Sequence, residues 1–346
     1  MLETMFLGCY LLFILKYYLF FHKKPKIDAN RSYDLLHINS ENNNIPVIFN
    51  NSYKYTNIQS AENCKGFSET TRQISDFNCK DESFFKWLAG VIDGDGNFDI
   101  RNLNSNLVLK AIRIKLHNRD IRILTRIQNT LHIGKIRADK NKPHSLYIVS
   151  NFKDMSYLIN KLNGLIRIKV DGFQKACDCY GIKFIEANYN IEPFDPYFSG
   201  LVDTDGSIVY NYSSNRIECN LEFKYNDHTK NLNFDNVIPN YKPTKQLRVK
   251  KIKGYEKKYA SHKSIAFKYQ TVKGMVFLYD YFMKNRLYSD FKFYRVSKIK
   301  SFIVVRDYIN EPKDSIEFKI YSDFILDWIQ YRNPLWYKVP FVDKIR

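Results

Sequence analysis

Cysteine is scarce in this chain, with six residues in 346 and no Cys-x-x-Cys pair. Structural zinc sites draw on closely spaced pairs of cysteine or histidine ligands. Cys177 and Cys179 stand close together, but no second pair of cysteines matches them. The sequence therefore argues against a structural zinc site, and we expect reduced thiols in the core or at the surface.

Long apolar runs are also nearly absent. Only residues 5–21 are almost wholly apolar, and this run is broken by Lys16 and followed by the basic residues 22–24. A membrane-spanning helix needs about 20 apolar residues. Three interpretations stay open: a membrane tether, a targeting segment, or upstream coding sequence fused to the body. Because residues 25–80 are rich in Asn, Ser, Lys and Thr without periodicity, we treat 1–80 as a leader and linker, disordered or removed.

Acidic residues are too few to balance the basic ones. The formal net charge is +18, and residues 1–80 contribute only +2 of it, from nine basic and seven acidic side chains. The remainder of the chain is thus strongly basic, which favours a polyanionic partner over a neutral one. Tyr and Phe number 26 each beside abundant Asn, Lys and Ile, a composition that fits an AT-rich organellar gene.

What the chain does have is one stretch that occurs twice. The first copy, residues 87–96, reads WLAGVIDGDG, and the second, residues 198–206, reads FSGLVDTDG. The last acidic residues, Asp95 and Asp205, lie 110 positions apart, so each copy can begin a unit of ordinary domain size. An internal repeat of this kind determines the architecture before any local assignment.

Each copy has the pattern of a helix with one close-packing face. Helix-start signals precede both copies, Asp81-Glu82-Ser83 in the first and Asp195-Pro196 in the second. The helices then carry small pairs, Ala89-Gly90 and Ser199-Gly200. Glycine costs a helix interior about 1 kcal/mol, so we expect these pairs to let the two helices approach more closely than usual.

Both copies end in Asp-x-Asp-Gly. We expect Gly96 and Gly206 to adopt the left-handed conformation that stops a helix, with Asp95 and Asp205 presented at one shared place. A single such tetrapeptide is typical of a turn, but two copies behind similar helices indicate a site. Two facing carboxylates near a polyanion predict a divalent-metal site, since Mg²⁺ takes carboxylates together with phosphate oxygens.

The doubled stretch resembles the defining motif of the LAGLIDADG family, which comprises homing endonucleases and intron maturases commonly encoded in group I introns of organellar genes. The second copy is looser, with Phe198-Ser199 replacing Leu-Ala, but neither copy loses its final acid. The resemblance spans residues 81–346. It implies a mitochondrial protein, in the matrix or at the inner membrane, that works with Mg²⁺ or Mn²⁺.

The patterning after each copy predicts an α+β fold. Strand alternation is clear in Ile112, Ile114 and Leu116, and in the second half Leu247 and Val249 are expected to face away from basic neighbours. The predicted order in each repeat is αββαββα, although residues 236–239 interrupt the middle helix of the second. Two pseudo-symmetric antiparallel sheets would then form a basic saddle for DNA. We assign residues 81–190 to the first repeat and 191–346 to the second with its C-terminal tail.

The polar faces of these strands supply candidate nucleic-acid contacts, because strand side chains can reach base edges in the major groove. An ordinary solvated sheet face is the competing interpretation for any one of them. The candidates are Arg101, Arg113, Lys115, Lys135, Arg137, Asn220, Glu222, Lys224, Arg248, Lys250, Lys268 and Gln270.

The resemblance also implies a set of site residues. Asp95 and Asp205 would hold the metal, and the backbone carbonyls of Gly94 and Thr204 would be further ligands. A basic residue after the third helix of each half would stabilise charge or orient water. Lys169 and Lys292 are the residues that we expect in that role, while Asp93 and Asp203 are expected to be helix-end or interface residues.

Three functions follow from these features. The first is a monomeric, site-specific endonuclease that breaks double-stranded DNA and spreads its intron. The second is a maturase that binds its own group I intron RNA to assist splicing, with or without cutting. The third, a membrane-attached structural protein, is disfavoured by the charge of the body. Retention of both Asp95 and Asp205 favours the nuclease, because RNA binding alone does not require them.

Overall fold

The structure is a computed structural model that describes residues 74–103, 106–253 and 259–345. The chain divides into two units, Met1–Gly66 and Phe67–Arg346, and all the described residues belong to the second. The predicted leader and the apolar run 5–21 lie outside the described residues. None of the helices that the structure describes is long and apolar enough to cross a membrane.

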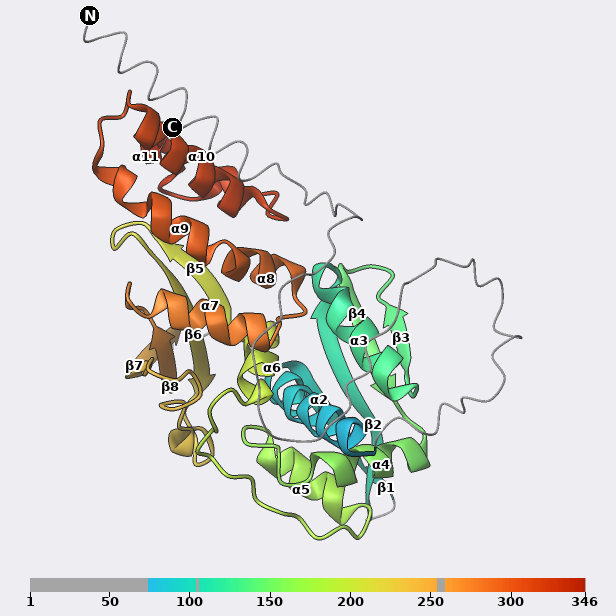
Figure 1. Cartoon of the computed structure of the whole chain (residues 1–346). Coiled ribbons are helices and arrows are strands. Elements are labelled where there is room, and N and C mark those ends of the chain that lie inside the picture. Colours follow the sequence, from blue (N-terminus) through green and yellow to red (C-terminus); the bar gives the residue numbers. More distant parts are fainter. Residues whose placement is uncertain (1–73, 104–105, 254–258, 346) are drawn as a thin grey trace, which may run out of the picture. The chain divides into compact units, whose positions relative to one another are not determined.

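The first half follows the predicted order αββαββα and adds a short 3₁₀ turn, η3, and one further helix, α5 (Figure 1). Its elements are α2 (Ile74–Asp95), β1 (Gly96–Leu103), β2 (Asn106–His117), η3 (Asn118–Asp120), α3 (Ile121–Leu131), β3 (Lys135–Ala138), β4 (His144–Val149), α4 (Phe152–Leu162) and α5 (Val170–Asp178).

The second half repeats the helix and strand pairs and continues into a helical C-terminal region (Figure 1). Its middle helix is missing, as predicted, because only the 3₁₀ turn η4 lies between β6 and β7. The elements are α6 (Pro196–Thr204), β5 (Ser207–Asn211), β6 (Arg216–Lys224), η4 (Thr229–Asn231), β7 (Thr244–Lys253), β8 (Tyr259–Tyr269), α7 (Met275–Lys284), α8 (Asp290–Ser297), α9 (Ile299–Val305), η5 (Arg306–Asn310), α10 (Ile316–Gln330), η6 (Trp336–Lys338) and α11 (Val342–Ile345).

Two four-stranded antiparallel sheets confirm the predicted α+β fold. Their strand orders are β1-β2-β4-β3 and β5-β6-β8-β7, so both sheets have the same topology. In β2 the predicted inner residues Ile112, Ile114 and Leu116 are all buried. Leu247 and Val249 lie on a strand and so face away from their basic neighbours, as predicted. They are nevertheless 67% and 64% exposed, so their face of the strand is not in the core. They lie on β7, an edge strand of its sheet that pairs only with β8.

The two motif helices, α2 and α6, begin differently. Helix α6 starts as predicted, with the side chain of Asp195 accepting a hydrogen bond from the Tyr197 backbone N–H and with Pro196 in the first turn. Helix α2 is already helical at Ile74, the first described residue, so the start predicted at residues 81–83 was wrong. Polar residues at these positions are tolerated inside a helix, because intrinsic propensity is a weak determinant beside packing.

The small pairs bring α2 and α6 into backbone contact, as predicted. A Cβ atom added to Gly90 would lie 2.2 Å from the carbonyl oxygen of Tyr197, and one added to Gly200 would lie 2.1 Å from that of Trp87. No side chain fits in these gaps. The glycines therefore allow the close approach of the two helices.

Gly96 and Gly206 were expected to be left-handed, and this prediction was wrong. Among the described residues the glycines with positive φ are Gly134, Gly164 and Gly181. A Cβ on Gly96 would lie 2.7 Å from Cα of Ile92, and a Cβ on Gly206 would lie 2.5 Å from Cα of Val202. Each glycine is needed because the strand leaves the helix by passing tightly over its last turn.

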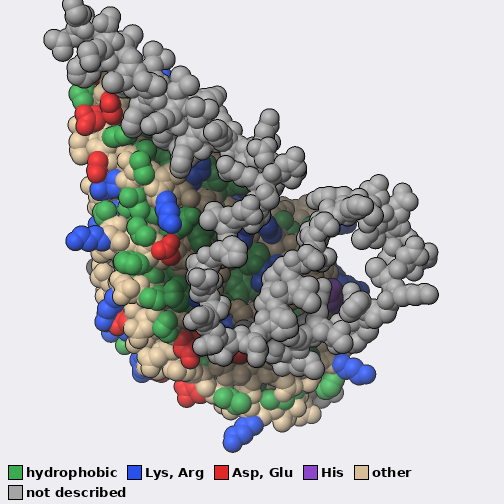
Figure 2. Space-filling model, in the orientation of Figure 1, with side chains coloured by type: hydrophobic (Ala, Val, Ile, Leu, Met, Phe, Trp, Pro, Cys, Tyr) green, Lys and Arg blue, Asp and Glu red, His purple; other side chains and the backbone are tan. Residues whose placement is uncertain are grey.

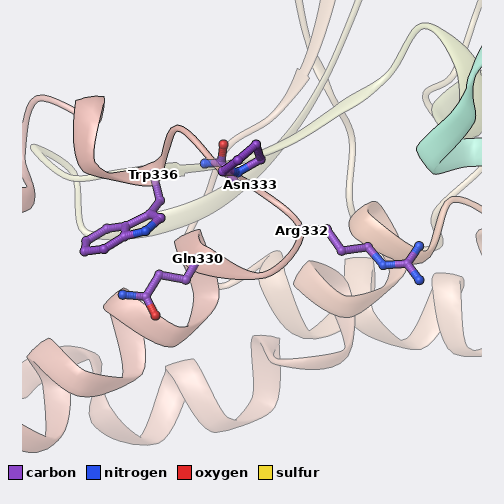
Figure 3. Close-up of a pocket in the computed structure, with 5 residues that line it drawn as sticks. Gln330, Arg332, Asn333 and Trp336 are labelled. Atoms are coloured by element: carbon purple, nitrogen blue, oxygen red, sulfur yellow. The ribbon is translucent and has the colours of Figure 1, made fainter. Parts of the chain in front are cut away.

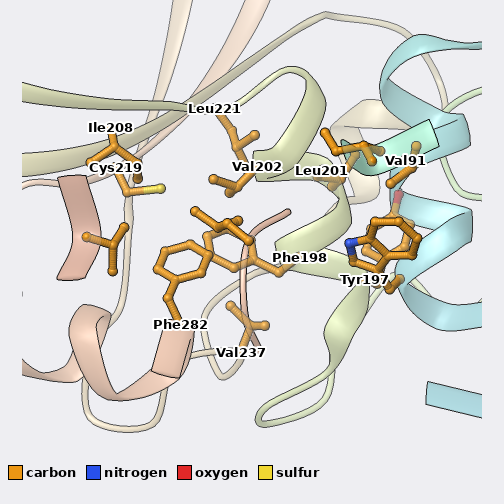
Figure 4. Packing of buried hydrophobic residues seen from close by; sticks show 14 of the residues in the cluster. Val91, Tyr197, Phe198, Leu201, Val202, Ile208, Cys219, Leu221, Val237 and Phe282 are labelled. Carbon is orange, nitrogen blue, oxygen red and sulfur yellow. The ribbon is translucent and has the colours of Figure 1, made fainter. Parts of the chain in front are cut away.

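The core of the second half is rich in aromatic rings. Phe198 of α6 stacks on Phe282 of α7 with 5.9 Å between ring centroids, and the two lie side by side in Figure 4. Cys219 lies among the same buried residues (Figure 4). The described cysteines are free, and burial raises the pKa of the Cys219 thiol to about 12. They behave as the expected reduced thiols.

Candidate active site and nucleic-acid interface

The two motif acids sit at the ends of the two packed helices. Asp95 is the last residue of α2, and Asp205 is the C-cap residue of α6. Burial raises the pKa of Asp95, and the negative charge of Asp205 raises it further. Burial also raises the pKa of Asp205, whose side chain still reaches solvent. The structure thus brings Asp95 and Asp205 together, as predicted from the doubled motif.

Neither carboxylate has a hydrogen-bond partner among the described residues, although many other acids in this part of the chain do. Two partly buried carboxylates whose charges repel each other favour a bound cation. The described residues contain no group of three or more His, Cys, Asp or Glu that could hold a metal. Any metal here would therefore depend on these two acids with backbone and phosphate oxygens, which is a donor set that suits Mg²⁺.

Lys169 and Lys292 occupy corresponding positions at the two helix ends. The Lys169 ammonium donates hydrogen bonds to the carbonyls of Gly94, at 2.5 Å, and Gly96. The Lys292 ammonium donates to the carbonyls of Val202, Asp203 and Thr204 at 2.8–2.9 Å. Unpaired carbonyls at a helix C-terminus attract cations.

Burial lowers the pKa of both lysines, while nearby carboxylates act in the opposite direction. The carboxylates include both motif acids, Asp95 and Asp205, for each lysine. The structure thus places both predicted lysines beside the two acids.

Gly94 and Thr204, the predicted carbonyl ligands, face each other across the helix pair. A Cβ on Gly94 would lie 2.0 Å from Oγ1 of Thr204, whose own side chain bonds back to the Gly200 and Leu201 carbonyls. Each of the two carbonyls already accepts a hydrogen bond from a lysine. A carbonyl oxygen has two lone pairs, so these bonds leave one for a further partner.

Asp93 is a structural residue of the site, in agreement with its predicted role. It is 1% exposed and accepts hydrogen bonds from the backbone N–H groups of Arg167 and Lys169 at 2.7 and 2.9 Å. The Tyr197 hydroxyl on the other motif helix donates to it at 2.7 Å. Asp93 therefore fixes the segment that carries Lys169.

Asp203 does the same in the second half. It accepts hydrogen bonds from the backbone N–H groups of Tyr288 and Ser289, both at 2.8 Å, just before Lys292. Trp87 Nε1, on the other motif helix, donates to it at 3.0 Å. Burial raises the pKa of Asp203 to about 7 in spite of these donors. The two halves thus share one design, in which an aromatic donor from one helix bonds an acid on the other.

Arginines cover these two aromatic donors, and sequence reasoning missed them. The guanidinium of Arg126 lies 4.9 Å from the Trp87 ring and 3.7 Å from the Tyr288 ring, and that of Arg167 lies 4.3 Å from the Tyr197 ring. Burial lowers the pKa of Arg126 to about 10. No spacing rule links these residues to the motif, so only the three-dimensional fold reveals them.

The first sheet groups most of its predicted nucleic-acid contacts on one face. Lys115 on β2 and Arg137 on β3 both pair with Leu146 of the strand between them. Arg113 and Lys135 pair with Ile148 of that strand in the same way. Side chains at paired positions lie on the same face of a sheet. Lys115, Lys135 and Arg137 are exposed.

Two further predicted contacts on this sheet are already paired with an acid. Arg101 and Arg113 are both held by Asp99, at 3.0 and 2.6 Å. Part of the predicted positive charge is therefore neutralised within the sheet. Asp99 was not recognised from the sequence as a partner of these arginines, because Arg101 is two residues along the same strand and Arg113 lies on the neighbouring strand.

The second sheet is more internally paired. Asn220 pairs with Lys268 across the sheet, and Glu222 lies 3.5 Å from Arg248 and accepts a hydrogen bond from Ser264 at 2.5 Å. Lys224 is exposed at the end of β6, and Gln270 directly follows β8. Lys250 lies in β7, and its side chain is outside the described part of the structure.

The helical face seen in Figure 2 has no comparable array. There, described Lys and Arg side chains are scattered among apolar and acidic ones. Both sheets therefore remain the best candidates for contact with a polyanion.

Two cavities lie in the described part of the chain at very different places. The larger, about 510 Å³, is near the C-terminus and is lined by Trp336 and Gln330, while the Arg332 guanidinium points away from the indole (Figure 3). The smaller, about 360 Å³, opens beside Lys169 and Gly96. Neither motif acid lines these two cavities, but the smaller one is lined by Lys169 and by Gly96, the residue after Asp95.

Comparison with known proteins agrees with the motif. The family model described as LAGLIDADG endonuclease matches residues 88–180. The intron-encoded RNA maturase bI4 of Saccharomyces cerevisiae is 32% identical over 146 residues, which are 42% of this chain and 22% of that protein. The intron-encoded DNA endonuclease ai2a of Dictyostelium discoideum is 24% identical over 253 residues, 70% of this chain and 74% of that protein.

Among solved structures, the LAGLIDADG meganuclease I-AabMI bound to uncleaved DNA is 15% identical, with a TM-score of 0.45, and the match covers 69% of this chain and 97% of that one. The chain spans about a fifth of the length of the maturase that it matches. The match to the LAGLIDADG endonuclease model covers residues 88–180, and over this segment it confirms the resemblance inferred from the motif.

Proposed function

We propose that this protein is a site-specific endonuclease that hydrolyses both strands of a DNA duplex with the help of a divalent metal. The observation that carries the proposal is that Asp95 and Asp205 stand at the C-terminal ends of two packed helices. At each of these ends a lysine ammonium donates hydrogen bonds to the last backbone carbonyls of the helix. We also propose that residues 81–190 and 191–346 act as the two repeats of one monomer, each serving one strand.

The metal, Mg²⁺ or Mn²⁺, would be held by Asp95, Asp205 and the carbonyls of Gly94 and Thr204, and it would activate water and neutralise the phosphate. The protein itself supplies orientation and charge. Lys169 and Lys292 each place an ammonium next to the acids, where it can stabilise the negative charge that develops on the phosphate. The shared basic sheet faces would position the duplex through phosphate and base-edge contacts.

The test is cleavage by the full-length protein of DNA that spans the uninterrupted insertion junction of its host gene. Wild type is compared with Asp95→Asn and Asp205→Asn in the presence of Mg²⁺ and with EDTA. We expect double-strand breaks from wild type that require metal, and nicking or no cutting by the variants. Wild-type protein that binds this DNA without cutting it, at any metal concentration, would overturn the proposal.

The second candidate function is that of a maturase that binds its own group I intron RNA. It is favoured by the identity of 32% over 146 residues to a protein named as an RNA maturase. Splicing of a precursor transcript with and without the protein distinguishes the two functions. Stimulation of splicing by Asp95→Asn as strong as that by wild type would separate the RNA function from the nuclease acids.

The relatives also suggest where the protein works. One is named for an intron of cox1 and another for an intron numbered bI4, and we propose a mitochondrial location, in the matrix or at the inner membrane. The basic body suits either DNA or RNA as a partner. Fractionation of mitochondria with a version lacking residues 5–21 tests whether this run tethers the protein.

A further inference from the structure

The lysine of the second half is supported by a contact between the two repeats. Ser289 is the N-cap residue of α8, the helix that carries Lys292, but its hydroxyl does not cap that helix. The hydroxyl donates instead to Oδ1 of Asp120, in η3 of the first repeat, at 2.5 Å. Ser289 is fully buried and Asp120 is 8% exposed. Since water cannot compete at such a site, this bond fixes the start of α8 against the first repeat.

Asp120 and Asp203 hold Ser289 from two sides. Asp203 accepts a hydrogen bond from the Ser289 backbone N–H at 2.8 Å, while Asp120 takes the hydroxyl. Residues three apart lie on neighbouring positions of one helix face, so a fixed Ser289 also fixes the direction in which Lys292 leaves α8. From there the Lys292 ammonium reaches the end of α6 and its three carbonyls.

Asp120 also acts on Lys292 through its charge. Asp203 and Asp120 are the two carboxylates that most favour the charged form of this lysine. The oxygens of Asp120 are engaged by Ser289 and by Arg119, whose Nε lies 3.4 Å away. Asp120 is therefore placed to support the ammonium rather than to bind a metal.

The first half has no equivalent of this contact among the described residues. Lys169 is itself the N-cap residue of α5 and makes no side-chain cap bond. At the turn that corresponds to η3, His228 Nε2 lies 3.0 Å from Asp171, but the Asp171 side chain is 85% exposed. An exposed pair of this kind contributes little to stability, because solvent screens it. The two lysines are thus held by contacts of unequal strength.

We propose that Asp120 is a positioning residue for Lys292, and that it supports cleavage of one particular DNA strand. The inference rests on the proposed function, because it gives Lys292 the task of stabilising charge at one of the two scissile phosphates. Without Asp120 the half that carries Lys169 stays intact, so one strand is cut normally and the other slowly. The protein then becomes a strand-selective nicking enzyme.

The experiment follows both strands of a target duplex labelled with different dyes, cut by the full-length protein. Asp120→Ala and Ser289→Ala are expected to slow the same strand about tenfold or more, with KM little changed, because the lysine is displaced while DNA binding persists. The double variant should be no slower than Asp120→Ala alone, since both changes remove the same bond and Asp120→Ala already removes the charge. Thermal melting verifies that each variant is folded.

The matched control is His228→Ala, which removes the exposed contact between His228 and Asp171 of α5, the helix that begins after Lys169. It should leave the ratio of the two strand rates unchanged. Equal slowing of both strands by Asp120→Ala, or a strand bias of the same size in the control, overturns the proposal.

A second readout does not depend on cutting. In NMR spectra of protein with isotope-labelled lysine side chains, Ser289→Ala should shift the Lys292 signal and leave the Lys169 signal in place, with Lys→Arg variants for assignment. If wild type cuts neither strand and the shift is confined to Lys292, the proposed function fails and the positioning role stands. If both lysines shift equally, or neither shifts, the positioning role fails.

Discussion

The indole N–H of Trp87 donates a hydrogen bond of 3.0 Å to Asp203, across 116 positions of sequence and between the two motif helices. Tyr197 holds the corresponding position on the other helix and bonds Asp93 at 2.7 Å. Each of these acids also orders the backbone just before a site lysine. The bonds that join the two repeats are therefore the same bonds that shape the candidate active site.

The contact between the motif helices should be intolerant of any added atom. Gly90→Ala and Gly200→Ala place a Cβ about 2 Å from a carbonyl oxygen of the facing helix. We expect each to lower the free energy of unfolding by about 2 kcal/mol or more, since overpacking forces the backbones apart. Urea denaturation measures the effect.

The control for these variants is Gly172→Ala in α5, where a Cβ would meet only a side chain at 3.5 Å. This change should stabilise the protein by about 0.5–1 kcal/mol, because alanine is the better helix former. A similar loss of stability in all three variants would contradict the helix-contact explanation.

The buried acid Asp203 should make stability depend on pH. Its pKa in the folded protein is raised to about 7 from a usual value of 3.8. Between these values the folded state binds more protons than the unfolded state, so stability falls as pH rises from about 4 to about 7. Asp203→Asn lacks this titrating group, so its free energy of unfolding should not show this fall. The wild-type free energy of unfolding should therefore decrease relative to that of the variant as pH rises from about 4 to about 7. Chemical denaturation at several pH values measures it, and parallel curves for the two proteins would refute the assignment.

Loss of Lys292 should cost more stability than loss of Lys169. Both lysines lie near carboxylates, but Lys292→Met leaves three helix-end carbonyls without their donor, whereas Lys169→Met leaves two. We expect a deficit of about 1–3 kcal/mol for Lys292→Met relative to Lys169→Met, because each unsatisfied buried acceptor carries a penalty. Differential scanning calorimetry compares the two, and equal melting temperatures would count against it.

Metal affinity should weaken in mild acid. Burial raises the pKa of both Asp95 and Asp205 above the usual range, and a metal binds the deprotonated forms. A fall in pH therefore protonates the site earlier than it would ordinary surface acids, and added Mg²⁺ should restore occupancy. Calorimetric titration with Mg²⁺ or Mn²⁺ over a range of pH measures this. Affinity that does not change between neutral and mildly acidic pH would exclude these acids as ligands.

Binding to DNA should depend on salt through the exposed basic residues of the first sheet. Arg137→Gln should weaken binding and reduce the slope of log affinity against log salt by about 0.9, the value for one phosphate contact. Lys319→Gln, an exposed residue of α10 away from both sheets, is the control. Fluorescence anisotropy at several salt concentrations measures both. An equal change of slope in the two variants would argue against a specific sheet interface.

Much of the fold could be predicted from the sequence because periodicity and repetition are strong signals. The alternation of Ile112, Ile114 and Leu116 reports one buried sheet face, and the doubled motif reports two helices that meet. The break in the second middle helix was equally readable, since Pro239 and its neighbours cannot continue a helix.

Other features could not be predicted because they depend on where distant segments meet. Leu247 and Val249 are exposed because they lie on an edge strand. The alternation of apolar and polar residues predicts a strand, but it does not predict the position of that strand in the sheet. The role of Gly96 was misjudged because a tight exit from a helix needs glycine as much as a left-handed residue does.

The candidate site shows the same division. Asp95, Asp205 and the two lysines follow from the motif, but the bond between Ser289 and Asp120 joins residues 169 positions apart. Arg126 likewise finds its aromatic partners only after folding. A single sequence contains no local pattern that records such pairs.

The exchange of donors between the motif helices has one more consequence. Trp87 and Tyr197 stand at matching positions but differ in size and in the atom that donates. The surroundings of the Trp87 indole do not fit the Tyr197 phenol equally well. Two copies of the same half would therefore not pair as well as the two different halves do. Mispaired assemblies of like halves are thereby disfavoured during folding, and the outer surfaces of the two sheets are free to diverge while their partnership is preserved.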